Sequence, residues 1–337
     1  MYAWLKACVR APNSGRAANI LIREKVVFVG KKALVIGAAG FIGSHLSARL
    51  LAQGLEVSGL DSFEESLYPS AARKSKISRL KTEGLEFVEL DAVSVDWGSL
   101  LRGVDVVYNM AAVPGLSPSW DKFPEYNHSN LTLVAALLKG LSKFPSSYLV
   151  HASTSSVYGE IVNKNSSEKP NSPYGVTKLA AEHLIRAYSD AYGIRYSILR
   201  YFSVYGPEPR PDQFFAILLD KLSTGQTIEI FGDGLNSRTN TYVDDLVDAT
   251  LLAGNTRAEK LTVDICGIES ATTLEIVEMV AAEMHLKPSI RHVPSRIGDQ
   301  RSTSGSGADA LKNLGWSPKT SLKDGIAEMV RVFQKGT

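Results

Sequence analysis

The sequence predicts an α/β protein with a doubly wound parallel β-sheet and a smaller C-terminal domain. Three observations support this prediction. Apolar runs of strand length alternate with helical periodicity from Lys32 to Tyr205. A glycine-rich turn joins the first predicted strand to the first predicted helix. After Gly206 the composition changes, beginning with the proline-rich loop GPEPRPDQ, and shorter elements follow.

The predicted elements follow the order that right-handed crossovers between parallel strands require. The run Ala33–Ile36 is continuously apolar, as in a strand buried on both faces, and Ile42, Leu46 and Leu50 then recur at helical spacing. The other predicted strands cover residues 56–61, 85–91, 104–112, 147–153 and 195–206, helices are expected over 130–140 and 172–192, and a late strand, 261–266, returns to the sheet.

These elements suggest a division of the chain into three parts. We expect an N-terminal extension over residues 1–31, a nucleotide-binding domain over 32–205 with a return segment near 241–268, and a substrate-binding domain over 206–240 and 269–337. The extension carries four basic residues and no acid before Glu24, as an organelle presequence would. We favour an additional N-terminal segment, because the stretch is short of serines and shows no cleavage signal.

The overall composition is that of an ordinary globular enzyme. Of 337 residues, 44% are hydrophobic and 21% charged, and the net charge of +2 gives no reason to expect a nucleic-acid partner. Cys8 and Cys266 form no disulfide framework, which suits a reducing compartment, and we expect the cytoplasm. The six histidines lack metal-ligand spacing, so we expect no metal site. No apolar run approaches the roughly 20 residues of a membrane helix.

The glycine-rich turn, Gly37, Gly40 and Gly43, predicts a dinucleotide site. Glycines at this spacing allow a tight turn, close approach of the backbone to a pyrophosphate, and close packing of the following helix. The helix that begins near Phe41 then presents free N–H groups to the anion.

Asp61 ends the second predicted strand, roughly 20 residues after the turn, where a carboxylate binds the ribose 2′-hydroxyl. A carboxylate there repels a 2′-phosphate, so we expect NAD rather than NADP. Asp91, after the third strand, could accept from the adenine amino group or cap a loop, and both interpretations stay open. The predicted cofactor-binding residues are Gly37, Gly40, Phe41, Ile42, Gly43, Asp61, Ser62, Asp91, Ala92, Ala111, Tyr174 and Lys178.

Tyr174 and Lys178 stand four residues apart on a predicted helix and therefore project from one face. A phenol has a pKa of about 10 and is a weak base near neutrality. A neighbouring ammonium and an oxidised nicotinamide ring both favour the phenolate and lower that pKa.

With these motifs in place, the chain resembles the extended short-chain dehydrogenase/reductases, in particular the NAD-dependent nucleotide-sugar epimerase/dehydratase group. The resemblance runs from about Lys32 to Phe333 and rests on GAAGFIGSHL, STSSVYG, SPYGVTKLAAEHL, LRYFSVYGP, FGDG, TYVDDLVDA and GDQR. It implies a Rossmann-type sheet, a tightly held NAD, Tyr174 as the base, Lys178 on the nicotinamide ribose, and Thr154 sharing a hydrogen bond with the sugar 4-hydroxyl.

The residues after Thr154 decide which reaction of the group is expected. The related 4,6-dehydratases have Asp and Glu there, and UDP-glucuronate decarboxylases have a Glu that resembles the position of Ser156. This chain has Ser155 and Ser156, and a hydroxyl is far too weak an acid to replace a carboxyl group. Elimination is therefore unexpected. Oxidation at C4, rotation of the 4-keto sugar and return of the hydride remain, which is 4-epimerisation.

The expected substrate is a UDP-sugar, most like that of the UDP-glucuronate 4-epimerases. Ser203 stands where UDP-galactose 4-epimerases usually have Asn, and Arg210 follows in the RPD segment. The resemblance implies that these residues, with Thr154, Ser155 and Ser156, hold the C6 carboxylate through charge-assisted hydrogen bonds. UDP-glucose or UDP-N-acetylglucosamine stays open as the substrate, and so does a non-catalytic NAD-binding sensor, although sensors tend to lose the Tyr/Lys pair.

Two further arginines, Arg238 and Arg301, match positions that bind the substrate diphosphate in the family. The chain departs from the family pattern at Ser117, where an arginine is common, and at Gly305-Ser306. The family often dimerises through helices, here 131–141 and 179–192, so we expect a homodimer, although the apolar positions of these helices could also pack internally.

Overall fold

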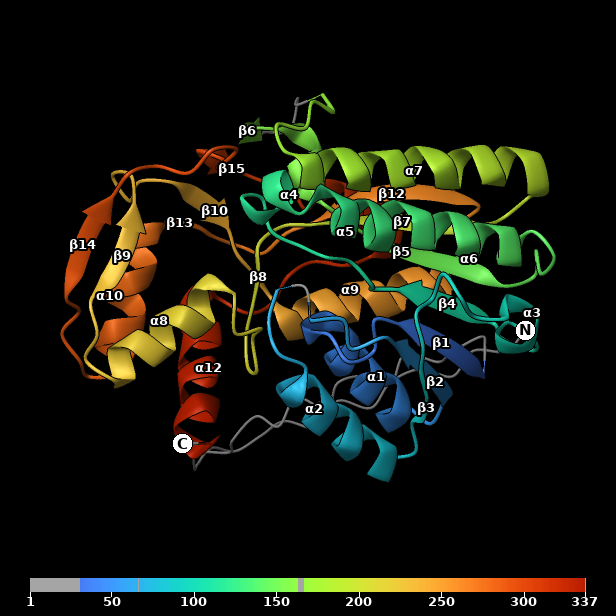
Figure 1. Cartoon of the computed structure of the whole chain (residues 1–337), viewed down its shortest axis with the longest axis horizontal. Helices are drawn as coiled ribbons and strands as arrows, with labels where there is room; N and C mark the ends of the chain where they lie inside the picture. Colours follow the sequence, from blue (N-terminus) through green and yellow to red (C-terminus); the bar gives the residue numbers. More distant parts are fainter. Residues whose placement is uncertain (1–30, 66, 163–166, 337) are drawn as a thin grey trace, which may run out of the picture.

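The central sheet of the computed structural model has seven parallel strands. The structure describes residues 31–65, 67–162 and 167–336, so the predicted extension lies outside the described residues except for Lys31. The strand order is β12-β7-β5-β4-β1-β2-β3 (Figure 1). The bounds are β1 (Lys32–Ile36), β2 (Glu56–Asp61), β3 (Glu86–Glu89), β4 (Val106–Asn109), β5 (Tyr148–Thr154), β7 (Tyr196–Tyr201) and β12 (Lys260–Ile265).

The chain reverses its direction across the sheet between β1 and β4. It runs from β1 outward through β2 to β3, then returns to pair β4 with the other side of β1 and continues through β5, β7 and β12. Ligands of open α/β sheets bind at such a reversal, outside the carboxyl ends of the strands. The predicted doubly wound parallel sheet is confirmed, and its topology points to the β1–β4 crevice.

Helices cover both faces of this sheet (Figure 1). One face packs on α1 (Phe41–Ala52) and α9 (Val243–Thr256), and the other on α3 (Trp97–Leu100), α6 (Leu133–Leu141) and α7 (Pro173–Tyr192). Residues of β1 alternate between the two cores, with Val35 in the first and Leu34 in the second. Burying each such side chain stabilises the fold by about 1.5–3 kcal/mol, which explains why the predicted strands are apolar runs.

A second group of elements lies beside the sheet, on the left in Figure 1. The helices α8 (Phe214–Ser223), α10 (Thr273–Glu283) and α12 (Leu322–Gly336) share one apolar core, and β9 (Ile228–Phe231) pairs with β14 (Ile290–Val293). A four-stranded sheet has the order β13 (Ser270–Thr272), β10 (Ser237–Thr239), β15 (Ser302–Thr303), β6 (Ile161–Val162). A pair joins β8 (Val204–Tyr205) to β11 (Thr241–Tyr242). The remaining helices are α2 (Ala71–Thr82), α4 (Pro118–Asp121), α5 (Phe123–Asn127) and α11 (Ala308–Leu314).

Two predicted elements are divided in the structure. The helix expected over 130–140 begins as a π-helical turn, His128–Thr132, and continues as α6. The apolar run 195–206 forms β7 and then the short β8, separated by Phe202 and Ser203. In both places a polar residue, Asn130 or Ser203, interrupts the regular pattern beside the crevice. By contrast, α7 begins one residue after its predicted start, where Ser172 caps it through the N–H of Gly175.

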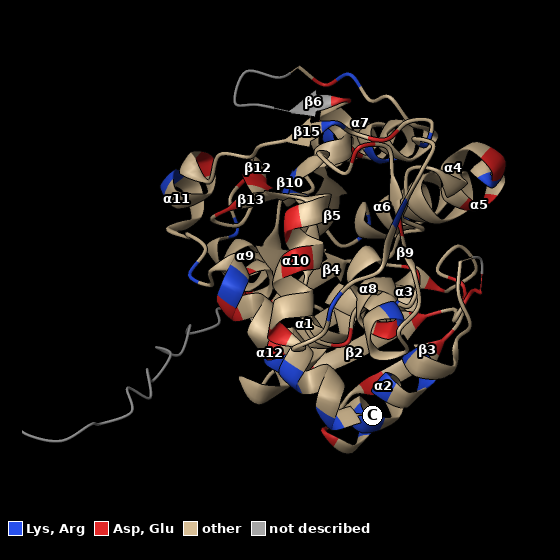
Figure 2. Cartoon of the chain, turned by 90° about the vertical axis from the view of Figure 1, so that its left-hand side faces the viewer, with Lys and Arg blue, Asp and Glu red and all other residues tan. Residues whose placement is uncertain are grey.

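Positively and negatively charged residues are interspersed in the view of Figure 2. Figure 2 shows lysine and arginine side by side with aspartate and glutamate along the helices of this view. Among the described residues no helix is long and apolar enough to cross a membrane.

Candidate active site

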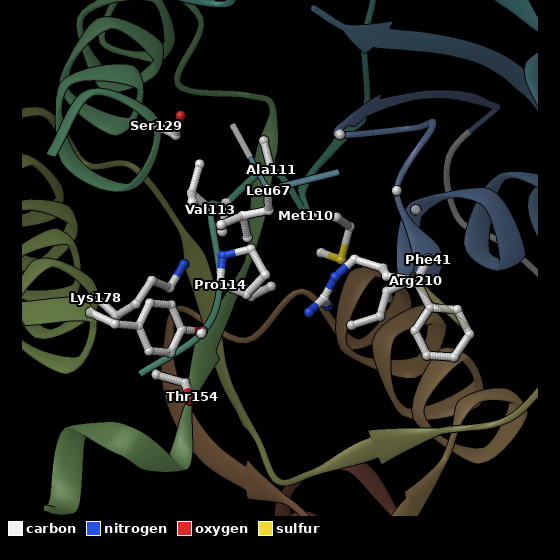
Figure 3. Close-up of a pocket in the computed structure, with 18 of the residues that line it drawn as sticks. Phe41, Leu67, Met110, Ala111, Val113, Pro114, Ser129, Thr154, Lys178 and Arg210 are labelled. Atoms are coloured by element: carbon white, nitrogen blue, oxygen red, sulfur yellow. The ribbon is translucent and has the colours of Figure 1, made fainter. Parts of the chain in front are cut away.

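A cavity of about 770 Å³ opens at the carboxyl ends of the central strands. It is lined by residues from the first half of the chain and by residues beyond position 200, so segments far apart in sequence meet there (Figure 3). Every predicted site residue lines this cavity except Arg301. The lining includes Gly37, Gly40, Phe41, Ile42, Gly43, Asp61, Ser62, Asp91, Ala92, Ala111, Thr154, Ser155, Ser156, Tyr174, Lys178, Ser203, Arg210 and Arg238.

The turn between β1 and α1 requires glycine at two positions. Gly37 has φ +79°, and a Cβ there would lie 2.7 Å from the backbone nitrogen of Ala111. A Cβ on Gly43 would lie 2.0 Å from the carbonyl oxygen of Gly37. Helix α1 begins at Phe41, and no side chain caps its first turn. The free N–H groups therefore face the cavity, and the turn fits a dinucleotide pyrophosphate.

Asp61 ends β2 with its carboxylate at the cavity. Its two oxygens accept from the backbone N–H of Ala39 (3.2 Å) and of Phe63 (2.9 Å), and Arg73 lies 3.6 Å away. Burial raises the pKa of Asp61, and these donors and the guanidinium act in the opposite direction. The carboxylate is therefore rigidly held, as a ribose ligand needs to be.

Both carboxylate oxygens of Asp91 have partners within the protein. The carboxylate accepts from the backbone N–H of Val93 at 2.9 Å and pairs with His128 Nε2 at 2.7 Å. These contacts favour the loop interpretation that the sequence left open, although Asp91 also lines the cavity.

The π-helical turn fastens one wall of the cavity. Asn130, fully buried, accepts from the N–H of Val113 at 2.8 Å and donates to the carbonyl of Val113 at 3.1 Å and to Thr177 Oγ1 at 3.2 Å. One amide thus connects the loop after β4 to helix α7. Insertions of this kind in helices often occur at functional sites.

Tyr174 and Lys178 lie on the first two turns of α7 and line the same cavity. Burial raises the pKa of the Tyr174 phenol, while a hydrogen bond with Thr154 and the charge of Arg210 act in the opposite direction. Burial lowers the pKa of the Lys178 ammonium to about 8, and Glu182 opposes this shift. The expected lowering of the tyrosine pKa is therefore outweighed by desolvation among the chain's own groups.

The hydroxyl-rich stretch forms a buried 3-10 turn, Ser155–Tyr158, directly after β5. Thr154 begins this turn, because its Oγ1 accepts from the N–H of Ser156 at 3.1 Å and lies 3.2 Å from Ser156 Oγ. Since three adjacent hydroxyls meet at one strand end, the turn can surround a polar group of a ligand with donors.

Arg210 enters the cavity from the side opposite Lys178 and Thr154, as Figure 3 shows. Its Nε and Nη2 bind the carboxylate of Asp212 at 3.0 and 3.2 Å, which leaves Nη1 outside this pair. The loop that carries it is tied to α2, because Lys76 donates to the carbonyl of Glu208 and Arg79 binds the Glu208 carboxylate.

Arg238 and Arg301 occupy different environments. Arg238 lines the cavity and binds Asp299 at 3.0 Å, and burial lowers the pKa of its guanidinium. Arg301 is exposed, lies 3.6 Å from Asp233, and is outside the cavity lining. Of these two arginines, only Arg238 lies where it could contact a ligand in the cavity.

The fold and the site together define a Rossmann-type dinucleotide enzyme with a tyrosine and a lysine of one helix lining its cavity. The model of the NAD dependent epimerase/dehydratase family matches residues 33–266. The chain belongs to this family, and its cofactor is NAD. The predicted resemblance is confirmed.

Individual relatives cover nearly the whole chain. The "Uncharacterized UDP-glucose epimerase YtcB" of Bacillus subtilis is 38% identical, over 89% of this chain and 96% of the relative. A UDP-glucuronate 4-epimerase of Thermodesulfobacterium geofontis is 30% identical, over 88% and 94%.

Among solved structures, UDP-glucuronic acid 4-epimerase from Bacillus cereus, in complex with UDP-glucuronic acid and NAD, is similar with a TM-score of 0.86 and 35% identity. The similarity covers 91% of this chain and all of that one. MoeE5 in complex with UDP-glucose and NAD has a TM-score of 0.81 and 33% identity, over 90% and 99%.

Sequence reasoning missed polar residues buried beneath the site. His151 lies in the middle of β5 between apolar neighbours, and nothing in its sequence context separates it from a packing residue. Glu182 and Arg200 are also buried, and they pair with each other across α7 and β7. The spacing of Glu182 four residues after Lys178 was the available signal, because it places both residues on the buried face of one helix.

Proposed function

We propose that this protein is a UDP-sugar 4-epimerase that interconverts UDP-glucuronate and UDP-galacturonate. The observation that carries this proposal is the position of Arg210, which faces the hydroxyl turn across the cavity. An arginine opposite three hydroxyls provides donors on two sides of a bound sugar. A carboxylate at C6 can use these donors through charge-assisted hydrogen bonds.

The chain's own residues perform the proton chemistry. Tyr174 takes the proton of the sugar 4-hydroxyl and returns it after the 4-keto sugar has rotated, and Thr154 shares that hydrogen bond. Lys178, buried on the same helix face, holds the cofactor and places positive charge near the phenol. NAD, when bound, accepts the C4 hydride and gives it back to the opposite face of the sugar.

Holding the carboxylate also protects the intermediate. A 4-keto uronic acid is a β-keto acid and loses carbon dioxide when the C5–C6 bond aligns with the carbonyl π-system. Donors that keep the carboxylate in place, here Ser155, Ser156, Ser203 and Arg210, oppose that alignment. The absence of a carboxyl acid at positions 155 and 156 favours 4-epimerisation over elimination.

The decisive experiment compares UDP-glucuronate with UDP-glucose in wild-type protein and in Arg210→Ala. We expect Arg210→Ala to reduce kcat/KM for UDP-glucuronate by roughly 30-fold to several thousand-fold, because a desolvated charge loses its partner. UDP-glucose, with a neutral hydroxymethyl group, should change little. Arg238→Ala is the matched control, since loss of a diphosphate ligand weakens both substrates alike. Equal wild-type turnover of the two sugars, or an equal loss in Arg210→Ala, would contradict the proposal.

A 4-epimerase for UDP-glucose or UDP-N-acetylglucosamine is the second candidate. The pairing of Arg210 with Asp212 favours it, because Asp212 already neutralises part of the guanidinium charge. The B. subtilis relative, named for UDP-glucose, favours it as well. The same substrate comparison separates the two functions. A non-catalytic sensor would bind NAD and give no epimer with any UDP-sugar, and the retained Tyr174 and Lys178 argue against it.

We further propose a cytoplasmic homodimer. Large apolar side chains are exposed on three neighbouring helices, Trp120 on α4, Phe123 on α5, and Val176 and Tyr192 on α7. We also propose the division into a nucleotide-binding and a substrate-binding domain that the sequence suggests, which places Arg238 in the substrate-binding domain. Sedimentation equilibrium measures the dimer directly, and a monomer at micromolar concentration would contradict it.

A further inference from the structure

Three buried side chains form a chain of contacts behind the cavity. Lys178 Nζ lies 3.4 Å from His151 Nε2, and His151 Nδ1 lies 3.1 Å from the side-chain amide of Asn109. Lys178 is 1% exposed, and His151 and Asn109 are fully buried. His151 and Asn109 cannot exchange these partners for water, so the direction of each hydrogen bond is set by the protons that the groups carry.

The ammonium determines the protonation state of the imidazole. Lys178 carries three donors and no acceptor while it is charged, so Nε2 of His151 must accept. Burial and the Lys178 charge both lower the pKa of His151 far below its usual range, so the ring is neutral. A neutral ring that accepts at Nε2 carries its proton on Nδ1 and donates there.

The buried amide of Asn109 can accept the hydrogen bond that His151 Nδ1 donates. The Oδ1 atom of Asn109 is buried without a hydrogen-bond partner as the amide is placed, with Nδ2 facing His151. The two ends of an amide differ little in shape, and their assignment follows the hydrogen-bond network. Rotating the amide by 180° puts Oδ1 on the Nδ1–H of His151, with the amino group in its place.

A second contact of the same kind fixes the helix against the strand. Ser153, two residues after His151 on β5, donates to Glu182 Oε1 at 2.5 Å, and Glu182 follows Lys178 by four residues on α7. Two residues of strand rise about 6.6 Å and four of helix about 6 Å, so the two contacts match in register. Helix α7 is therefore held at two points along β5, and Lys178 is one of them.

We propose that His151 is a positioning residue for Lys178. The neutral Nε2 of His151 accepts a hydrogen bond from one ammonium N–H and leaves the other two N–H groups to donate to the NAD ribose. This inference rests on Lys178 being a cofactor ligand, as the proposed function has it. An ammonium on a flexible stem would otherwise sample several rotamers. A fixed acceptor behind it aims the remaining two donors at the cavity, which Lys178 lines together with Tyr174.

The charged and titratable groups around Lys178 come from three directions. Tyr174 and Glu182 face it from its own helix, His151 from β5, and Arg210 faces Tyr174 from across the cavity. Glu182 favours the charged lysine through its own charge, whereas His151 favours it through a hydrogen bond to the charged form. Removing the acceptor therefore lets Lys178 lose its proton at lower pH.

The test measures NAD affinity against pH by calorimetry, with no sugar present, in wild-type protein, His151→Leu and His151→Gln. A hydrogen bond to a charged group corresponds to about one pH unit. We expect the rise of the NAD dissociation constant with pH to begin about one pH unit lower in His151→Leu. His151→Gln, which keeps an acceptor at similar reach, should restore the wild-type profile. Lys178→Met should remove this pH dependence altogether.

A second measurement requires no variant. Nitrogen NMR of histidine-labelled wild-type protein at pH 7 should show His151 protonated on Nδ1 and not on Nε2. A proton on Nε2, or unchanged pH profiles in both His151 variants, would overturn the proposal and leave His151 as a packing residue. Neither readout depends on which sugar is the substrate, so this proposal and the proposed function can fail separately.

Discussion

Arg200 on β7 and Glu182 on α7 form a two-point ion pair beneath the active site. Arg200 Nη2 lies 2.6 Å from Oε2 and Nε lies 3.0 Å from Oε1, and Glu182 is fully buried. Arg200 also binds Glu168 and the hydroxyl of Tyr158, and Tyr158 donates to Asp264 on β12. This network joins helix α7 to the strands on one side of the sheet and to the end of the hydroxyl turn.

Glu182→Gln should therefore destabilise the protein by about 3–5 kcal/mol, because it leaves a buried guanidinium without its main partner. Arg186→Ala is the matched control. Arg186 binds the same carboxylate at 2.8 Å from a half-buried position one turn away, and its loss should cost at most about 1 kcal/mol. Urea unfolding of both variants measures the difference. Equal destabilisation would mean that the pair of Glu182 with the half-buried Arg186, and not its pair with the buried Arg200, holds the helix.

We expect Asp61 and Arg73 together to determine the preference of the protein for NAD over NADP. Wild-type protein should bind NAD far more tightly, because the carboxylate accepts from a 2′-hydroxyl and repels a 2′-phosphate. Asp61→Ala should narrow this preference and leave Arg73, 3.6 Å away, free to attract the phosphate. Adding Arg73→Ala should weaken NADP again while changing NAD little. Calorimetry with both cofactors checks wild-type protein and the two variants, and equal affinity of wild-type protein for NAD and NADP would refute this account.

Tyr174→Phe should lower turnover by roughly 10²-fold or more, since the proposed proton acceptor is lost. NAD binding should stay within a few-fold of wild type, because Lys178 and the glycine turn remain. Tyr126→Phe serves as control. Its ring packs edge-on against Tyr174 at 6.1 Å between centroids, and its hydroxyl donates to the Pro114 carbonyl. Substantial turnover in Tyr174→Phe would assign the base to another residue.

The buried Lys178 should make the stability of the protein without added NAD depend on pH. Burial lowers its pKa from 10.5 to about 8, so between these values the unfolded chain binds more protons than the folded protein. The free energy of unfolding of wild type, relative to that of Lys178→Met, should therefore rise by about 2 kcal/mol between pH 7 and pH 9.5. Denaturant unfolding at both pH values measures this difference. If the difference in the free energy of unfolding between wild type and Lys178→Met stays constant with pH, burial does not lower the pKa of Lys178.

Much of the fold could be predicted because its physical signals are local. A strand buried on both faces must be continuously apolar, as β1 is, and the turn at Gly37 tolerates only glycine, so both are visible in the sequence. The interruption of a helix by the π-helical turn could not be predicted. It depends on Asn130 reaching the backbone of Val113, a tertiary contact with no local signature.

The site divides in the same way. Residues that line the cavity and are expected to contact a ligand, such as Tyr174 and Lys178, belong to short motifs with a recognisable spacing. His151 and Arg200 act through other residues, and only the packing of α7 on the sheet brings them to their partners. Whether a particular arginine reaches the cavity is also a tertiary question. Arg238 on β10 does, and Arg301, directly before the neighbouring strand β15, does not.

The four-stranded sheet that contains β6 and β10 has a mechanical consequence. Strand β6 follows the hydroxyl turn within a few residues, pairs with β15, and β15 pairs with β10, which carries Arg238. On the proposed assignment, the hydroxyls hold the sugar end of the ligand and Arg238 holds its diphosphate. Two strand spacings, roughly 10 Å, separate these strands. The sheet therefore fixes the distance between the two ends of the ligand site. Because backbone hydrogen bonds and not a hinge set this distance, they also limit the length of the sugar nucleotide that fits.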